Sequence, residues 1–182
     1  MIRPLDKYDD IHSHDRSREL SGDTVVNLIP GDTMMPGGTY SVGIHPWESV
    51  RNIGIIELKR LVEMAGDSRV VAVGECGFDR LRGGDMEAQT SLFDFQARLA
   101  ARLGKPLVIH CVRAYDVLLA AARRLHPAPG MWIVHGFRGN AMTARQLLRA
   151  GMSLSLGERF NPDAAAVIPP DRLYRETDAP QA

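Results

Sequence analysis

The sequence predicts an α/β fold, a (β/α)8 barrel of the TIM type that is trimmed at its beginning and its end. Three observations support this prediction. About eight short runs, most of them rich in Val, Ile or Leu, indicate buried strands, and amphipathic stretches separate the later runs. Residues of metal-ligand type also stand where five of the runs end. Side chains from separate strands meet only where strand ends converge, and this barrel brings its strand ends together at one rim.

The predicted strands recur along the whole chain. Each is a short apolar run bounded by turn residues or by an amphipathic segment. They cover residues 8–11, 24–29, 40–44, 69–74, 106–109, 132–134, 152–156 and 173–176.

Four amphipathic helices are predicted between the later strands, over residues 49–65, 87–103, 114–125 and 141–150. The first carries Leu58 and Val62 on one face at helical spacing. The second is followed by Gly104, which is a common residue at the end of a helix. Residues 163–171 contain Pro169 and Pro170, so they allow only a short helix.

The connections at the front of the chain are too short for full helices. Residues 15–23 show little apolar periodicity, and residues 30–39 form a turn rich in Gly and Pro. The chain also stops four residues after Asp178, which leaves no room for an eighth helix. An ordinary barrel of this type takes roughly 250 residues. We therefore expect residues 1–182 to form one domain with shortened early helices and no C-terminal helix.

The composition argues against several classes of protein. The 22 basic and 22 acidic residues balance, so no overall charge steers the chain toward nucleic acid or a membrane. Nineteen of the basic residues are Arg, which suits local contacts with phosphate. The first residues lack the apolar core of a signal peptide, and no apolar run approaches the roughly 20 residues of a membrane span. With only two cysteines and no disulfide framework, these features predict a soluble, cytoplasmic protein.

Six residues of metal-ligand type form the most informative pattern in the chain: His12, His14, Glu75, His110, His135 and Asp178. His12 and His14 are two residues apart, so on a strand they share a face and can reach one ion. A carboxylate such as Glu75 after an apolar run is costly to bury unless it is neutralised. Several histidines and two carboxylates around one point indicate a two-metal hydrolase.

Each of these residues also has a plainer interpretation. The His-x-His pair is weak evidence alone, and Glu75 could pair with an arginine such as Arg80. A single histidine at a strand end is more often a satisfied core residue. Asp178 could cap a helix ahead of Ala179, although almost no chain remains to form one. The six residues together favour a shared metal site over these separate explanations.

The other histidines and the cysteines fall outside this set. His45, in the segment GIHPW, is expected near the site without a metal role, either as a phosphate contact or proton donor or as a turn histidine. His126 is expected at a helix end, far from the rim. Cys76 and Cys111 each follow a candidate ligand, and strand alternation should turn them away from the site, as small buried hydrophobic residues.

Taken in order, several segments resemble the TatD family of metal-dependent deoxyribonucleases, within the amidohydrolase-like barrels. The matching segments, from about Asp10 to Pro180, are DIHSH, GIHPW, AVGECGFD, QARLAARLGKPLVIHC, VHGFRG with GMSLSLGE, and ETDAP. The resemblance implies two divalent ions bridged by Glu75. One ion would be held by His12, His14, Glu75 and Asp178, and the other by Glu75, His110 and His135. Asp178 would also orient or deprotonate the attacking water.

The chain departs from the family pattern in three ways. It is considerably shorter than usual members. Arg113 comes three residues after His110, where the family's arginine commonly comes two residues after the histidine. Arg138 stands where a smaller polar residue is usual. We expect Arg113 and Arg138, on loops after two neighbouring strands, to clamp phosphate oxygens, with solvated loop arginines as the alternative.

The function predicted on this basis is that of a phosphodiesterase or deoxyribonuclease that uses two divalent ions, Mg, Mn or Zn, on DNA or a small phosphoester. One alternative is another hydrolase on the same scaffold, acting on a lactone, phosphotriester or amide. Several of those bridge their metals with a carboxylated lysine, and none of Lys7, Lys59 and Lys105 is at a predicted strand end. A metal-binding barrel without activity is the second alternative. No membrane partner is expected, and the protein is expected to be a monomer or a homodimer that covers strands left bare by missing helices.

Overall fold

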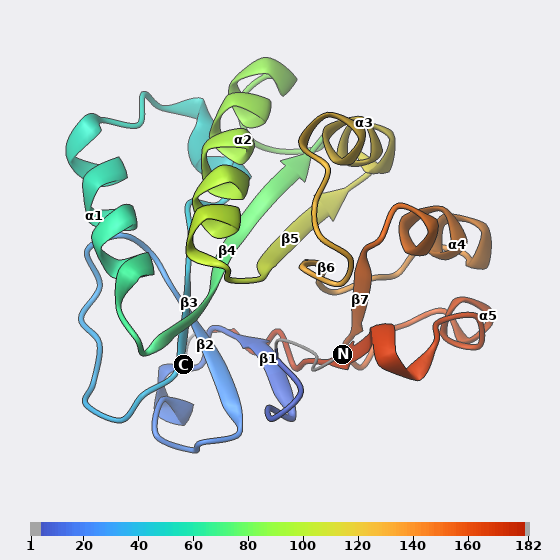
Figure 1. Ribbon diagram of the computed structural model, residues 1–182, viewed down its shortest axis with the longest axis horizontal. Helices are drawn as coiled ribbons and strands as arrows, with labels where there is room; N and C mark the ends of the chain where they lie inside the picture. Colours follow the sequence, from blue (N-terminus) through green and yellow to red (C-terminus); the bar gives the residue numbers. More distant parts are fainter. Residues whose placement is uncertain (1–4, 181–182) are drawn as a thin grey trace.

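A computed structural model describes residues 5–180, in which eight parallel strands form one sheet whose strand order follows the chain (Figure 1). This arrangement confirms the predicted α/β barrel. The strands are β1 (Asp10–Ser13), β2 (Thr24–Leu28), β3 (Tyr40–Val42), β4 (Val70–Asp79), β5 (Leu107–Val112), β6 (Trp132–Val134), β7 (Ser153–Leu156) and β8 (Leu173–Arg175).

The barrel is nearly closed by contacts between β1 and the segment that follows β8. The backbone N–H of Asp178 donates to the carbonyl of His12 at 3.1 Å, and the N–H of His14 donates to the carbonyl of Ala179 at 2.8 Å. These two bonds place the His-x-His segment directly beside Asp178. Residues that are far apart in the sequence therefore share one edge of the rim.

The helices lie between the later strands, as predicted. They are α1 (Ile55–Gly66), α2 (Met86–Leu103), α3 (Tyr115–Leu125), α4 (Ala141–Arg149) and the short α5 (Pro162–Ala165), with 3-10 turns η1 (Arg16–Arg18), η2 (Pro46–Val50) and η3 (Pro170–Arg172). The first predicted helix was too long, since η2 occupies its start and α1 begins only after Gly54. Helix α2 ends as expected, with Gly104 in the left-handed conformation.

The early part of the barrel has no α-helix in the described residues. Only η1 connects β1 to β2, and a loop connects β2 to β3, so no α-helix lies between these strands along the chain (Figure 1). After β8, residues 176–180 are not helical. Within residues 5–180, no helix combines the length and apolar character needed to cross a membrane.

Two apolar layers support the rim. The inner layer fills the barrel with residues from six strands and from the segment before β1: Leu5, Tyr8, Ile11, Val25, Ala72, Val108, Ile133 and Tyr174. The outer layer packs the helices against the sheet and includes Phe93, whose ring is tilted against Phe78 of β4 and meets Trp132 of β6 edge to face. Because side chains fill the interior of the barrel, the polar groups at the rim lie above a packed core rather than an open channel.

Strands β4 and β5 extend further than predicted. They pair from Val73 with Leu107 to Asp79 with Val112, so Glu75 and His110 lie within strands rather than at their ends. The register shifts between Val73 and Cys76, around Glu75. Gly77 makes the extension possible, because a Cβ atom at this position would come within 1.9 Å of the carbonyl oxygen of His110.

Asp10 connects the two sides of the barrel closure. Its buried carboxylate accepts from the backbone N–H groups of His12 at 3.2 Å and Thr177 at 3.0 Å. It also accepts from the hydroxyl of Thr177 at 2.6 Å and from the guanidinium of Arg18 at 2.7 Å. One carboxylate thus fixes the segments that carry His12 and Asp178.

We expect the substitution Asp10→Asn to lower the free energy of unfolding by about 2–3 kcal/mol, because it removes the charge and turns an amide NH2 toward two donors. Urea unfolding with an unchanged slope would measure this loss. Asp9→Asn is the matched control, since Asp9 is exposed. Equal stability of the two variants would show that Asp10 does not hold the closure.

Candidate metal centre

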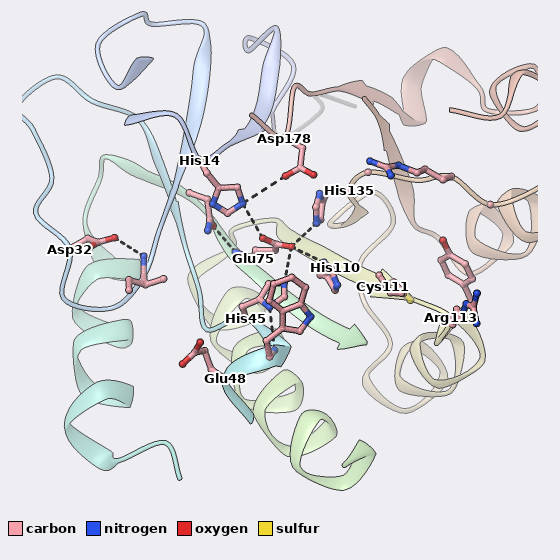
Figure 2. Close-up of a pocket in the computed structure, with 18 of the residues that line it drawn as sticks. His14, Asp32, His45, Glu48, Glu75, His110, Cys111, Arg113, His135 and Asp178 are labelled. Carbon is pink, nitrogen blue, oxygen red and sulfur yellow. Dashed lines mark hydrogen bonds and ion pairs between the residues drawn. The ribbon is translucent and has the colours of Figure 1, made fainter. Parts of the chain in front are cut away.

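Glu75 lies at the centre of the rim, surrounded by five imidazole rings. Its carboxylate is 5% exposed. The nearest ring nitrogens come from the ends of β1 and β6, from within β5 and from the cap of η2: His12 at 3.4 Å, His14 at 3.4 Å, His45 at 3.2 Å, His110 at 2.9 Å and His135 at 2.7 Å. The strand ends therefore converge as the predicted fold requires (Figure 2).

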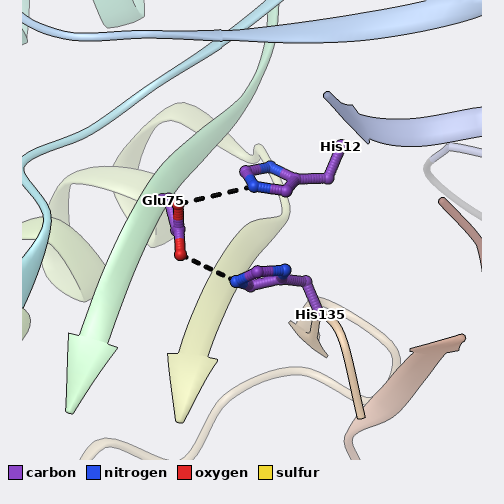
Figure 3. Close-up of side chains that lie close together, drawn as sticks. All are labelled: His12, Glu75 and His135. Carbon is purple, nitrogen blue, oxygen red and sulfur yellow. Dashed lines mark hydrogen bonds and ion pairs between the residues drawn. The ribbon is translucent and has the colours of Figure 1, made fainter. Parts of the chain in front are cut away.

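The two oxygens of Glu75 divide its neighbours into two groups. Oε2 faces His12 and His14, whose Nε2 atoms also lie 3.7 and 3.8 Å from Oδ1 of Asp178. We call His12, His14 and Asp178 the Oε2 group. Oε1 faces Nδ1 of His110 and Nε2 of His135, which we call the Oε1 group. Figure 3 shows His12 and His135 reaching the two oxygens.

The donor atoms fit metal ions. Ligand atoms within 4.8 Å of one another include those of His12, Glu75 and His135, and those of His12, His14 and Asp178. Both ring nitrogens of His12 are buried and have no hydrogen-bond partner within residues 5–180. An unpaired buried nitrogen is costly, and a cation bound to its lone pair would remove that cost.

The residues of the centre carry strongly coupled charges. Burial alone would raise the pKa of Glu75, but His135, His110 and His12 outweigh it and hold that pKa well below its usual range. Burial lowers the pKa of His135, yet the charges of Glu75 and Glu176 raise it well above its ordinary value. Without a metal ion, the negative charge of the Glu75 carboxylate is thus balanced by protons on the surrounding imidazoles. A bound metal ion can replace those protons.

Buried amides position this part of the rim. The backbone N–H of Glu75 donates at 2.7 Å to Oδ1 of Asn27 in β2, which also accepts from the hydroxyl of Ser41. Gln96 of α2 exchanges two hydrogen bonds with the backbone of Ile44, next to His45. The side-chain amides of Asn27 and Gln96 thus form hydrogen bonds with backbone groups that a neighbouring strand does not pair. They were not predicted from the sequence, because only the fold brings them to the rim.

His45, which was predicted to lie near the site, is next to Glu75. Its Nδ1 accepts from the backbone N–H of Trp47 at 3.2 Å, so the proton of the neutral ring lies on Nε2. That nitrogen is 3.2 Å from Oε1 of Glu75 and therefore faces it as a donor. In this tautomer His45 is a hydrogen-bond donor to Glu75, although its ligand atom also lies within 4.8 Å of those of Glu75 and His110.

A cavity of about 1070 Å³ opens over Glu75. Arg113 and Asp178 line it (Figure 2), as does Arg138, and both arginines are exposed without an ion pair in the described part of the chain. Arg113 has a φ of 52°, an uncommon conformation for a residue with a side chain. None of the described residues that line the cavity is a lysine, and the carboxylate with histidines at both of its oxygens is Glu75.

The structure also places three residues that have plainer interpretations. Arg80 pairs with Asp116 at 2.7 Å and not with Glu75. Residues 179 and 180, which follow Asp178, are not helical. His126 caps the end of α3, as expected.

The prediction that both cysteines point away from the site is correct only for Cys76, which is fully buried with its pKa raised by burial. Cys111 lines the cavity, although burial raises the pKa of its thiol to about 12. The reason is that β6 pairs with β5 only as far as Ile109, so the last residues of β5 border the cavity instead of β6.

Two buried carboxylates near the centre were not predicted. Asp79 lies 3.1 Å from Nε2 of His110, and Glu176 lies 3.3 Å from Nδ1 of His135. Asp79 was missed because β4 was predicted to end too early. Glu176 could have been found, since it is two residues before Asp178 and directly follows β8.

A family described as TatD related DNase matches residues 32–182. The chain belongs to the TatD family. A relative from Erwinia billingiae, called a 3′-5′ ssDNA/RNA exonuclease TatD, is 36% identical over 160 residues, which cover 81% of this chain and 60% of that protein. A Mycobacterium tuberculosis relative, called an uncharacterized metal-dependent hydrolase TatD, is 37% identical over 77% of this chain and 57% of its own length. This TatD chain thus spans less than two thirds of the length of these curated relatives.

Solved structures of TatD proteins share the fold. The Escherichia coli TatD homologue YjjV superimposes with a TM-score of 0.73 at 23% identity, covering 96% of this chain and 80% of that one. A TatD family hydrolase from Entamoeba histolytica gives a TM-score of 0.74 at 19% identity, covering 94% and 73%. The barrel described above is therefore the TatD fold.

Proposed function

We propose that this TatD chain is a divalent-metal-dependent phosphodiesterase that acts on single-stranded nucleic acid. The observation that carries the proposal is the division of ligands around Glu75, with His12 and His14 at one oxygen and His110 and His135 at the other. A carboxylate placed in this way can bridge two ions. The Erwinia relative is called a 3′-5′ ssDNA/RNA exonuclease, which supports this class of substrate.

The Oε2 group and Glu75 would hold one ion, and the Oε1 group and Glu75 would hold the other. Two such ions would bind the phosphate, supply a nucleophilic water and stabilise the leaving oxygen. We propose Mg or Mn for turnover, with Zn as an ion retained on purification, because mixed His and carboxylate sites accept all three. Asp178 faces the cavity, is 39% exposed and would accept the proton of the attacking water.

Arg113 and Arg138 would bind the non-bridging phosphate oxygens. Both line the cavity, and neither guanidinium is committed to a carboxylate in the described residues. We expect Arg113→Gln and Arg138→Gln each to raise KM for an oligonucleotide by about tenfold, because each removes a charge-assisted hydrogen bond. Steady-state kinetics would measure the change, with the exposed Arg102→Gln as the control. An unchanged KM in both variants would make them solvated loop residues.

Metal affinity should rise with pH. The pKa of His14 is raised, chiefly by its hydrogen bond with Glu75, and that of His135 is raised by Glu75 and Glu176 against the effect of burial. These rings stay protonated to higher pH than the usual value of about 6.5, and binding must displace their protons. We expect the affinity to increase by about tenfold or more from pH 6 to pH 8. Titration calorimetry in two buffers would count the released protons, and a flat profile with no release would contradict this.

The test of the proposed function is cleavage of an end-labelled single-stranded DNA oligonucleotide with added Mg or Mn. A metal-dependent ladder that is lost with chelator and in Asp178→Asn would support it, and the ladder would also give the polarity. Well-folded, metal-loaded protein that cleaves neither DNA nor RNA would overturn it. Hydrolysis of lactones, phosphotriesters and amides by the same preparation would then identify the alternative chemistry.

A further inference from the structure

Each histidine of the Oε1 group has a buried carboxylate behind it. Nε2 of His110 lies 3.1 Å from Oδ2 of Asp79, and Nδ1 of His135 lies 3.3 Å from Oε1 of Glu176. The Asp79 and Glu176 side chains are 3% and 0% exposed. A carboxylate that accepts the outer N–H of an imidazole fixes its tautomer and makes the inner nitrogen a stronger ligand.

His110 and His135 turn different ring nitrogens toward Glu75, so each needs a different tautomer to bind a metal ion there. His110 presents Nδ1 to Glu75, whereas His135 presents Nε2. Each ring must therefore carry its proton on a different nitrogen for its inward nitrogen to be free. In both cases the carboxylate lies at the nitrogen that has to hold the proton.

Asp79 is itself firmly held. Its Oδ2 accepts from the indole N–H of Trp47 at 2.7 Å, and its Oδ1 accepts from the backbone N–H groups of Leu81 and Arg82. These three donors fix the position of the carboxylate behind His110.

The Oε2 group lacks this support. Nδ1 of His12 is buried without a hydrogen-bond partner, and no ring nitrogen of His14 donates to a second carboxylate behind it within residues 5–180. His12 is fully buried, but the other two members of the group, His14 and Asp178, are 36% and 39% exposed, against 14% and 6% for His110 and His135. Ligands that are more exposed and less fixed hold an ion less tightly.

We propose that the two metal positions are unequal, and that Asp79 and Glu176 are the positioning residues that make them so. The ion at Glu75, His110 and His135 is a resident ion with oriented, buried ligands. The ion at Glu75, His12, His14 and Asp178 is exchangeable and loads at higher metal concentration. This inference rests on the proposed two-ion function and adds an order of loading to it.

The test is a titration of the metal-free, full chain with Mn. Calorimetry and the spin-resonance signal of free Mn would both monitor the binding. We expect two binding steps whose affinities differ by at least about tenfold. Asp79→Asn and Glu176→Gln should each weaken the tighter step by about 10- to 100-fold and leave the weaker step unchanged. Asp171→Asn, at an exposed position, is the control and should change neither step.

A second readout separates positioning from a general effect on folding. In metal-free Asp79→Asn, imidazole nitrogen chemical shifts of His110 should show loss of the single tautomer, while those of His135 stay unchanged. Glu176→Gln should give the converse result. Two equal binding steps in the wild type, or variants that weaken both steps equally, would overturn the proposal.

The outcomes also separate this inference from the proposed function. If the two binding steps are unequal and the variants behave as expected, but the protein cleaves no phosphodiester, the proposed function is wrong and the inference of unequal metal positions holds. If cleavage depends on metal but the two binding steps are equal, the proposed function holds and the inference is wrong. Absence of Mn binding would overturn both.

Discussion

Glu75→Gln is expected to abolish both binding of metal and hydrolysis, with a loss of activity on the order of 10³-fold or more. The substitution preserves the shape of the side chain but replaces a doubly accepting, charged group by a neutral amide. The two sets of imidazoles would then face an NH2 on one side and lose their common anionic ligand. Neither ion keeps its bridge, so the loss should affect both.

Metal-dependent thermal stabilisation is the direct measurement for this variant. A ligand at 100 times its dissociation constant stabilises a folded protein by about 2.7 kcal/mol, and this increment should vanish in Glu75→Gln. Glu63→Gln is the matched control, since Glu63 is an exposed residue of α1. A variant that still gains stability from metal and still cleaves would show that Glu75 is not the bridge.

Asp178→Asn is expected to reduce turnover by about 10²- to 10⁴-fold while the ion at Glu75, His110 and His135 remains bound. Asp178 is the ligand of the Oε2 group that also faces the cavity, where it can take a proton from water. An amide keeps a coordinating oxygen but cannot accept that proton. The loss should therefore appear in kcat more than in the tighter metal affinity.

Single-turnover cleavage at saturating metal separates the two roles of Asp178. If the defect persists when both positions are filled, the carboxylate takes part in proton transfer. If high metal restores full activity, Asp178 is only a ligand. Retained activity at ordinary metal concentration would remove Asp178 from the chemistry altogether.

The sequence was sufficient to predict the barrel and to predict which side chains converge. Parallel strands have short apolar runs, and their ends must share one rim, so residues such as His12, His135 and Asp178 could be placed together from their positions alone. The division of ligands between the two oxygens of Glu75 could not be derived in this way. It depends on side-chain directions from five separate segments.

Strand lengths and supporting residues were harder to predict. The extension of β4 depends on pairing with β5 and on the close approach that Gly77 permits, which is a long-range property. Asp79 became recognisable as a partner of His110 only with that extension. Likewise, Asn27 and Gln96 are polar residues of ordinary segments, and their contacts with the rim come from tertiary packing.

Anomalous diffraction from crystals soaked in Mn would show directly whether Glu75 bridges two ions, because it locates the ions without reference to the substrate. We expect two peaks roughly 3.5–4 Å apart, on either side of Glu75, one beside His12, His14 and Asp178 and the other beside His110 and His135. At limiting Mn, the peak beside His110 and His135 should fill first. A single peak, or peaks that do not share Glu75, would contradict a bridged two-metal centre.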